Sequence, residues 1–246
     1  IPTYFTADIA YHINKLETRG YDWAINIWGA DHHGHVARMK SALDAVGIDS
    51  NKLDIVLMQL VRLMQDGEVV RMSKRTGKAI TLTDLLEDVS IDVARFFFNM
   101  RGAGSHLDFD LDLAKEQSND NPVFYVQYAH ARICGILRLL KEEGVEVKPY
   151  SEIEPDLLKE ETEIDLLKKL NDLPEEIKIA AQTLDPSKIT KYVIDLAACF
   201  HAFYNSCRVN VEEPKLRDCR LKLIDSVRIV VEGVLKALKI DAPEKM

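Results

Sequence analysis

The fold of the second half of this chain is decided by the stretch NPVFYVQYAHARICGILRLLKEEG, residues 121–144. It opens with Asn121-Pro122, a capping residue followed by proline at the first helical position. Mostly apolar side chains then return at spacings of three and four, and Gly144 ends the run. The face that they form comprises Val126, His130, Ile133, Leu137 and Leu140. The stretch therefore predicts one long amphipathic helix.

Further apolar stripes with the same period follow it. They predict two shorter helices, over residues 157–170 and 174–184, and two longer ones. The stripes of the longer helices are Ile189, Val193, Leu196, Phe200, Phe203 and Cys207, then Leu216, Cys219, Leu223, Val227, Val230, Val234 and Leu238. Such stripes are far more often core than ligand sites, so they indicate an antiparallel helical bundle over residues 116–246.

Residues 1–115 show a different, mixed α/β pattern. The predicted elements are a buried strand at 23–28, a helix at 32–46 capped by Asp31, a strand at 54–63 and a hairpin turn at Asp66-Gly67. We therefore expect two domains, residues 1–115 and residues 116–246, with helix dominating overall.

The composition indicates a globular protein. The chain has 246 residues, of which 47% are hydrophobic and 29% charged. It has no apolar run of about 18 residues, so we expect neither a membrane span nor a membrane partner. The net charge of −8 argues against non-specific nucleic-acid binding through bulk charge, but it is compatible with a local basic patch.

The four cysteines, Cys134, Cys199, Cys207 and Cys219, show no C-x-x-C spacing. They lie on apolar helical faces or beside them. We therefore expect buried, reduced thiols rather than zinc ligands or disulfides, which favours a cytoplasmic protein.

The segment VVRMSKRTGKAIT, residues 69–81, concentrates positive charge. Its cations are Arg71, Lys74, Arg75 and Lys78, with small residues among them. Small residues let backbone N–H groups approach an anion, and lysines add movable point charges, so phosphate is the expected ligand. The alternative is a solvated surface loop that binds nothing.

A histidine-rich segment, GADHHGH (residues 29–35), follows the first predicted strand and opens the predicted helix. Ligands of open α/β sheets bind at this end of a strand, and helix N-termini favour anions. Three interpretations stay open: a nucleotide site using His32 and His35, a metal site formed by Asp31, His32, His33 and His35, or a helix cap with surface histidines. A strand ending in Asp-His-His also resembles manganese-binding DHH-family phosphoesterases, whose other Asp-rich motifs are not evident here.

Tyr4 and Asp8 form a third candidate site. Because they are four residues apart, they would share one face of a helix or helical turn. A phenol and a carboxylate together suit a cationic side chain, and the planar guanidinium of arginine fits a carboxylate well. The alternative is a simple helix cap.

These motifs occur in the same order in one known family. Arg71-Met72-Ser73-Lys74-Arg75 closely resembles the KMSKS loop of class I aminoacyl-tRNA synthetases, from which only the first and last residues differ. The stretches that carry the wider resemblance are TYFTADIAYH (3–12), INIWGADHHGH (25–35), RMSKRTGKAITL (71–82), DVARFFFNMR (92–101) and SHLDFDLDLAKEQSNDNPVFYVQYAHARI (105–133). Over essentially its whole length the chain resembles bacterial-type arginyl-tRNA synthetase, a class Ia enzyme.

The resemblance implies a fold and an activity. Residues 1–115 would be a remnant of a Rossmann-type catalytic domain, and residues 116–246 an all-α anticodon-binding domain of the DALR type. The family is a ligase that activates L-arginine with ATP and transfers it to tRNA(Arg), releasing AMP and pyrophosphate. ATP is a substrate, Mg²⁺ accompanies it, and no tightly bound protein metal is expected.

The resemblance also assigns roles to single residues. Arginine would be held by Tyr4, Asp8 and His32, and ATP would contact His32, His35, Arg71, Met72 and Lys74. Lys74 would be catalytic, with Ser73 supporting it, because positive charge is needed where pyrophosphate leaves. Anticodon bases would contact Tyr125, Tyr128, Arg132 and Met246. The first three of these share a helical face by spacing, and aromatic stacking is how RNA loops are usually read.

The sequence also departs from the family pattern. The HIGH motif, which binds the phosphates and adenosine of ATP in this class, and the first strands of the Rossmann fold are not found in it. We therefore expect a C-terminal half that does not aminoacylate tRNA by itself. The full-length family is usually monomeric, whereas an incomplete sheet exposes an edge that favours self-association. The alternatives are a stand-alone tRNA-binding module and a metal-dependent DHH-type phosphoesterase.

Overall fold

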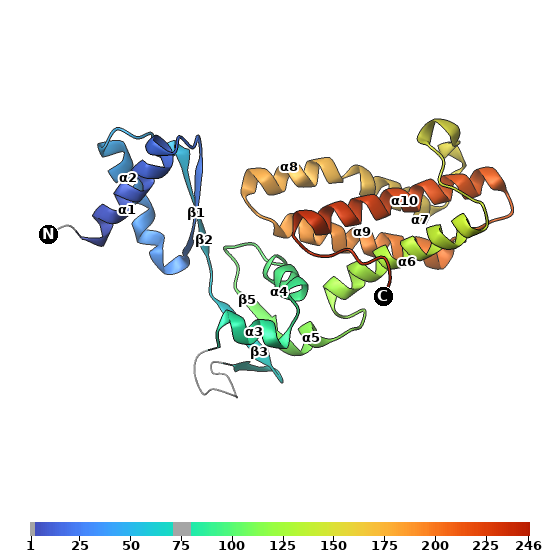
Figure 1. Ribbon diagram of the computed structural model, residues 1–246, viewed down its shortest axis with the longest axis horizontal. Coiled ribbons are helices and arrows are strands. Elements are labelled where there is room, and N and C mark those ends of the chain that lie inside the picture. The colour runs from blue at the N-terminus through green and yellow to red at the C-terminus, as the bar shows by residue number, and fades with distance from the viewer. Residues whose placement is uncertain (1–2, 71–79) are drawn as a thin grey trace. The chain divides into compact units, whose positions relative to one another are not determined.

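The computed structural model describes residues 3–70 and 80–246 (Figure 1). Its contacts divide the chain into two compact units. Unit 1 comprises Ile1–Arg62 and Gly102–Asp108, and unit 2 comprises Leu63–Arg101 and Phe109–Met246. The boundary near residue 115 between a catalytic and an anticodon-binding domain stays a prediction.

Unit 1 contains a β–α–β unit and a further helix that packs on it. Its elements are α1 (Tyr4–Ile13), a π-helical turn (Asn14–Thr18), β1 (Ala24–Gly29), a 3₁₀ turn (Ala30–His32), α2 (His33–Ala45), a second 3₁₀ turn (Ser50–Lys52) and β2 (Leu53–Met58). The strands β1 and β2 pair in parallel, with Ala24 opposite Leu53 and Gly29 opposite Met58. The predicted first strand and the helix after it are confirmed.

The core of unit 1 is small, and it lies between the helices and the two strands. Successive side chains of a strand point to opposite faces, so β1 buries Ala24 and Asn26 and exposes Ile25 between them. The buried apolar residues are Leu16, Ala24, Met39, Leu43, Ile48 and Leu53. This packing holds α1 and the start of α2 beside the carboxyl end of β1.

The predicted capping of α2 by Asp31 is wrong. The N-cap residue is His32, and no side chain caps this helix. Asp31 lies one residue too early, inside the 3₁₀ turn, and its carboxylate folds back over Gly29. A Cβ atom at Gly29 would lie only 2.5 Å from Oδ1 of Asp31, so a larger residue there would displace this exposed carboxylate.

After β2 the chain forms a small sheet and three short helices. The elements are β3 (Val61–Gln65), β4 (Glu68–Val70), α3 (Leu82–Asp88), α4 (Ile91–Phe98), β5 (Leu107–Asp110) and α5 (Leu111–Lys115). The predicted hairpin is confirmed between β3 and β4, and β5 lies on the other side of β3. Asp66 and Gly67 both have positive φ, 54° and 77°, as the favoured two-residue hairpin turn requires.

The remainder of unit 2 is the predicted helical bundle. Its elements are α6 (Pro122–Glu142), two 3₁₀ turns (Tyr150–Glu152 and Pro155–Leu157), α7 (Glu161–Asn171), α8 (Leu173–Thr183), α9 (Ser187–Ser206) and α10 (Pro214–Ala237). The side chain of Asn121 caps α6 and Pro122 is its first residue, as predicted. Helix α9 packs against α6, α7, α8 and α10, so it is the central helix of the bundle.

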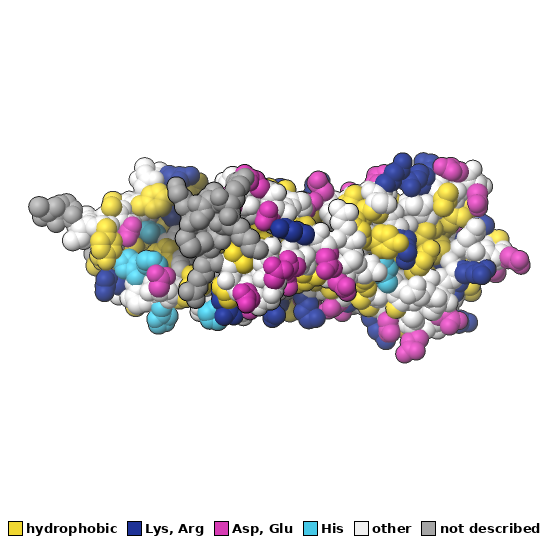
Figure 2. Space-filling model, turned by 90° about the horizontal axis from the view of Figure 1, so that it is seen from below, with side chains coloured by type: hydrophobic (Ala, Val, Ile, Leu, Met, Phe, Trp, Pro, Cys, Tyr) yellow, Lys and Arg dark blue, Asp and Glu magenta, His cyan; other side chains and the backbone are white. Residues whose placement is uncertain are grey.

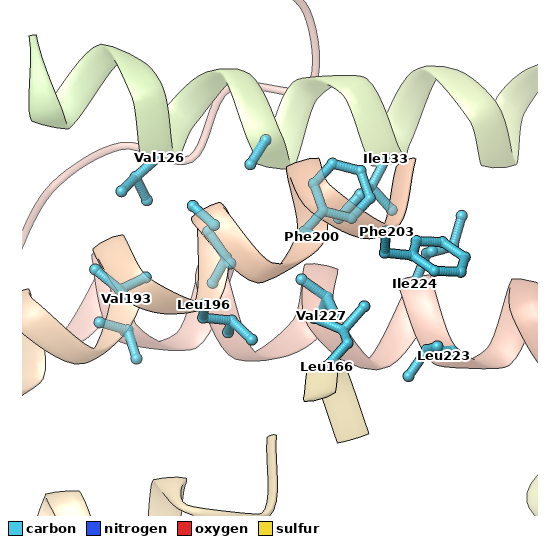
Figure 3. Close-up of a cluster of buried hydrophobic side chains, with 14 of the residues drawn as sticks. Val126, Ile133, Leu166, Val193, Leu196, Phe200, Phe203, Leu223, Ile224 and Val227 are labelled. Carbon is cyan, nitrogen blue, oxygen red and sulfur yellow. The ribbon is translucent and has the colours of Figure 1, made fainter. Parts of the chain in front are cut away.

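Apolar side chains from four helices meet in one buried cluster (Figure 3). The labelled members are Val126 and Ile133 from α6, Leu166 from α7, Val193, Leu196, Phe200 and Phe203 from α9, and Leu223, Ile224 and Val227 from α10. Phe96 of α4 is buried in the same cluster. The stripes read from the sequence are therefore core, and this core also includes a helix that precedes residue 116.

A buried ion pair ties α7 to α10. Glu163 is fully buried, and Nε of Arg220 donates to its Oε1 at 2.6 Å. The second carboxylate oxygen of Glu163 accepts the backbone N–H groups of Lys159 and Glu160. Nη1 of Arg220 donates to the backbone carbonyl of Arg208 at 2.7 Å. The pair thus joins two helices and the segment between α9 and α10.

All four cysteines are free thiols; Cys207 and Cys219 are buried, and Cys134 and Cys199 are half-buried. Burial is the largest cause that raises the pKa of Cys134, Cys199 and Cys219. Within the described ranges, no helix is both long and apolar enough to cross a membrane.

Candidate functional site

Unit 1 has a cavity of about 840 Å³ beside α1, the carboxyl end of β1 and the start of α2. Among its lining residues are all the described candidates for binding arginine and ATP: Tyr4, Asp8, His32 and His35. Figure 2 shows histidine side chains beside hydrophobic ones on the visible part of unit 1. The remaining ATP and catalytic candidates, Arg71, Met72, Ser73 and Lys74, lie outside the described residues.

Tyr4 and Asp8 lie one turn apart on α1 and face the same cavity, as their spacing predicted. The helix is preceded by Thr3 as its N-cap, so the alternative that these two residues form a simple cap is wrong. Tyr4 is 72% exposed, and the side chain of Asp8 is 48% exposed. A half-exposed carboxylate next to a phenol can accept hydrogen bonds from a guanidinium that enters from solvent.

His35 lies against Asp8, whereas His32 lies closer to solvent. Nε2 of His35 is 3.7 Å from Oδ2 of Asp8, and its ring centroid is 5.1 Å from that of Phe5 and 5.4 Å from that of Trp28. The side chain of His32 is 61% exposed, and its Nε2 is 3.7 Å from Asp31. The two histidines therefore differ in setting, one held among rings and one free to meet a ligand.

A buried polar network behind Asp8 was not predicted from the sequence. The ring of His12, 3% exposed, has Nδ1 at 2.7 Å from the backbone carbonyl of Asp8 and Nε2 at 2.6 Å from Nδ2 of Asn26. Nδ1–H therefore donates to the carbonyl, and Nε2 accepts from the amide. Nζ of Lys15 donates to Oδ1 of Asn26 at 3.0 Å. This network fixes the backbone at Asp8 relative to β1.

A second candidate site lies on the bundle, where α6 meets α9. Three of the predicted anticodon residues, Tyr125, Tyr128 and Arg132, come from α6. The guanidinium of Arg132 lies 4.5 Å from the ring centroid of Tyr128 and 4.6 Å from that of Tyr204 on α9, and it donates to the hydroxyl of Tyr128. The half-buried ring of Tyr128, the exposed ring of Tyr204 and the cation together form a surface on which a nucleic-acid base can stack.

Met246 reaches the same place. A cavity of about 370 Å³ is lined by Tyr128, Ala131, Arg132, Arg138, Glu244, Lys245 and Met246. The side chain of Met246 is half exposed, so it is available for contact. The structure thus brings Met246 together with two of the three α6 candidates. Tyr125 does not line this cavity, and its ring centroid lies 4.7 Å from that of His201.

Comparisons with known proteins cover the entire chain. Residues 126–246 match the family model "DALR anticodon binding domain". The arginine–tRNA ligases of Ruminiclostridium cellulolyticum and Caldanaerobacter subterraneus are 60% and 61% identical to the chain over all of its 246 residues. The chain corresponds to the C-terminal region of arginyl-tRNA synthetases and carries their DALR-type anticodon-binding domain. It spans 44% of the length of these two relatives and matches the C-terminal part of such ligases.

Solved structures of arginyl-tRNA synthetases share this fold. An arginyl-tRNA synthetase from Campylobacter jejuni is similar with a TM-score of 0.87 and 35% identity, over all of this chain and 53% of that one. The Thermus thermophilus arginyl-tRNA synthetase has a TM-score of 0.79 over all of this chain and half of that one, and at 23% identity it supports the fold alone. The expected helix-dominated architecture, an α/β part followed by a helical anticodon-binding domain, is confirmed.

The alternative of a DHH-type phosphoesterase receives no support from the family findings. Over residues 3–70 and 80–246, no group of three or more histidine, cysteine, aspartate or glutamate side chains is arranged to hold a metal ion. Asp31, His32, His33 and His35 are close in sequence, but they do not form such a group. His32 and His35 line the cavity of unit 1 instead.

His201, on α9, also belongs to the aromatic surface, which comprises Tyr125, Tyr128, Arg132 and Tyr204. The sequence did not predict this histidine as a member. Its ring centroid is 4.7 Å from that of Tyr125 and 6.1 Å from that of Tyr128. Its Nε2 is buried and has no hydrogen-bond partner among the described residues. Burial, assisted by the nearby positive charge of Arg132, holds the pKa of His201 below its usual 6.5, against a weaker opposite effect of the Tyr125 backbone.

We expect the pH dependence of stability to reflect His201. Its pKa is lower in the folded state, so the unfolded chain binds a proton more readily, and stability falls as pH drops below 6.5. The variant His201→Gln should lose this contribution. Urea unfolding of both proteins at about pH 7.5 and about pH 5.5 tests the effect, because the wild type should lose more stability than the variant between them. Equal losses would contradict the assignment to His201.

Proposed function

We propose that this chain supplies three parts of an arginine–tRNA ligase: the side of the catalytic pocket that holds arginine, the KMSKS-like loop, and the surface that reads the anticodon of tRNA(Arg). The observation that carries the proposal is the meeting of Tyr128, Arg132 and Met246 around one cavity of the anticodon-binding bundle. The pocket around Asp8 in unit 1 supports the same conclusion independently.

Arginine recognition would depend on Asp8 and Tyr4. The Asp8 carboxylate accepts two hydrogen bonds from a planar guanidinium, and the Tyr4 hydroxyl lies on the same helical face. The contact between His12 and the Asp8 carbonyl holds the backbone from which this carboxylate extends. His32, the more exposed histidine of the pocket, would contact arginine or ATP, and His35 would support Asp8.

Activation of arginine would be a displacement at the α-phosphorus of ATP. The carboxylate of arginine attacks the α-phosphorus of ATP, the bond to the β-phosphate breaks, and pyrophosphate leaves while arginyl-adenylate forms. Negative charge grows on the departing phosphates, so cations must lie beside them. Lys74 and Arg71, backed by Met72 and Ser73 of the KMSKS-like loop, would supply that charge, and Mg²⁺ would arrive with ATP. Transfer of arginine to tRNA releases AMP.

Asp8→Asn should weaken arginine use selectively. The substitution keeps the shape of the side chain but removes the charge that pairs with the guanidinium, so kcat/KM for arginine should fall about 10–100-fold. Pyrophosphate exchange measured against arginine concentration, in a full-length synthetase that carries this sequence, tests the prediction. The control is Asp22→Asn, because Asp22 is an exposed carboxylate of unit 1 that does not line the pocket. An unchanged kcat/KM for arginine in Asp8→Asn, or an equal fall in Asp22→Asn, would contradict the role.

Reading of the anticodon is tested directly by binding. The chain is titrated with an arginine tRNA and with the same tRNA altered only at the central anticodon base, at one fixed salt concentration. An altered base that fits this surface less well should weaken binding by about 1–3 kcal/mol. Equal affinity for the two RNAs would mean that contact is only electrostatic, and it would remove the anticodon-reading part of the proposal.

A further inference from the structure

The last residues of the chain lie along α6 rather than extending into solvent. After α10, Lys239 takes a left-handed conformation (φ 59°), and Ile240 is buried in the bundle core. The segment from Asp241 to Met246, here called the tail, then passes α6 without forming helix or strand (Figure 1). None of the tail residues is fully buried, so apolar packing alone does not fix its path.

Two side chains of α6 hold the tail through its backbone. Nε2 of Gln127 donates to the carbonyl of Asp241 at 2.8 Å. Nδ1–H of His130 donates to the carbonyl of Pro243 at 2.9 Å, and this histidine is only 2% exposed. Gln127 and His130 are three residues apart, so they lie on the same face of α6. The tail is therefore bound at two points about one helical turn apart.

Asp92 on α4 completes the first of these points. Its Oδ2 lies 3.3 Å from Nε2 of Gln127 and accepts the backbone N–H of Asp241 at 3.2 Å. Gln127 thus donates to two oxygens at once, and both the N–H and the carbonyl of Asp241 are satisfied. Glutamate at position 127 could not donate, and it would place an acceptor against Oδ2 of Asp92 and the carbonyl of Asp241.

The position of Met246 depends on this attachment. Its side chain is 53% exposed, whereas that of Ile240 is 4% exposed, so Met246 is not anchored by its own burial. Met246 nevertheless lines the cavity formed with Tyr128 and Arg132. These two residues lie on α6 between and just beyond the positions that hold the tail. The same helix therefore carries both the aromatic surface and the side chains that bring Met246 to it.

We propose that Gln127 and His130 are positioning residues for anticodon recognition: by holding the backbone of the tail, they place Met246 against the base that stacks on Tyr128. This inference rests on the anticodon-reading function proposed above. Gln127 and His130 themselves need not touch RNA, since Nε2 of Gln127 and Nδ1 of His130 are engaged with the tail.

The test compares how well variants of the full chain distinguish an arginine tRNA from the same tRNA with a changed central anticodon base. Met246→Ala sets the loss expected when the methionine contact is absent, about 5- to 100-fold in the ratio of the two affinities. Gln127→Glu and His130→Ala should lower the ratio toward that of Met246→Ala. Combined with Met246→Ala, neither should lower it further, because all three changes remove one contact. Gln182→Glu, on an exposed face of α8, controls for the added charge.

Rescue separates positioning from general damage. His130→Asn retains an N–H donor near the position of Nδ1 and should recover most of the discrimination that His130→Ala loses. Thermal unfolding of each variant shows whether the bundle is intact. If His130→Ala unfolds at a much lower temperature than the wild type, the test relies on Gln127→Glu, because position 127 is only half-buried. The inference alone would be overturned if Gln127→Glu and His130→Ala lowered the discrimination as much in the Met246→Ala background as in the wild type. It would also be overturned if both single variants kept the wild-type discrimination. Equal binding of both RNAs by the wild type would overturn the anticodon proposal and this inference together.

Discussion

Arg220→Leu is expected to lower the free energy of unfolding by about 3–5 kcal/mol, because it leaves the fully buried carboxylate of Glu163 without its partner. The same change frees the carbonyl of Arg208, which Arg220 also satisfies. Leucine supplies apolar volume but no donor, so the loss is mainly electrostatic. Urea unfolding of the full chain measures it.

The matched control is Arg228→Leu on the same helix. Arg228, whose side chain is 28% exposed, pairs with Asp225 and Glu232; Asp225 keeps Lys222 as a second cationic partner when Arg228 is removed, so this change should cost less stability than Arg220→Leu. A second variant, Glu163→Gln combined with Arg220→Leu, removes the unpaired charge and should recover part of the stability. If Arg220→Leu and Arg228→Leu cost the same, the pair of Arg220 with Glu163 is no more important than the partly exposed pair of Arg228.

Lys74→Ala should slow pyrophosphate exchange by about 10²–10³ in a full-length synthetase that carries this sequence, by analogy with the loss of one donor to a developing charge. The resemblance places Lys74 at the fourth position of the KMSKS-like loop, which follows β4. The expected effect is on the rate of activation rather than on KM for arginine, since the charge develops only as pyrophosphate leaves.

Lys78→Ala is the control for Lys74→Ala. It removes the same charge from the same basic segment but lies outside the five-residue match to KMSKS. It should change the exchange rate far less. An unchanged rate in Lys74→Ala would contradict the catalytic role, and equal losses in both variants would mean that the segment acts only through its overall charge.

The helical half of the fold was predictable because apolar side chains recur in the sequence at the spacing that places them on the buried face of a helix. The stripe from Val126 to Leu140 and the stripes of the last two helices are core in the structure. Local capping and strand lengths were less predictable. The expected strand 54–63 ends at Met58, where the N–H of Gln59 turns to the carbonyl of Ala103, a contact far along the chain. Such long-range hydrogen bonds leave no periodic signal.

The candidate sites were predictable only in part, for the same reason. Spacing on α6 brings Tyr125, Tyr128 and Arg132 to one face, but it does not tell which residues of another helix meet them. His201 and Tyr204 arrive from α9 through tertiary packing. In unit 1, Asn26 could be expected to point inward on β1, whereas its partner His12 is identified only by the fold.

The setting of Arg132 has an entropic consequence for any base that binds there. An arginine side chain carries about 2 kcal/mol of rotamer entropy when it is free. Here the rings of Tyr128 and Tyr204 and the hydroxyl of Tyr128 already restrict the guanidinium. The conformational entropy of this side chain is therefore lost when the bundle folds. A base that stacks beside it binds to a surface that is already ordered, so binding loses less entropy.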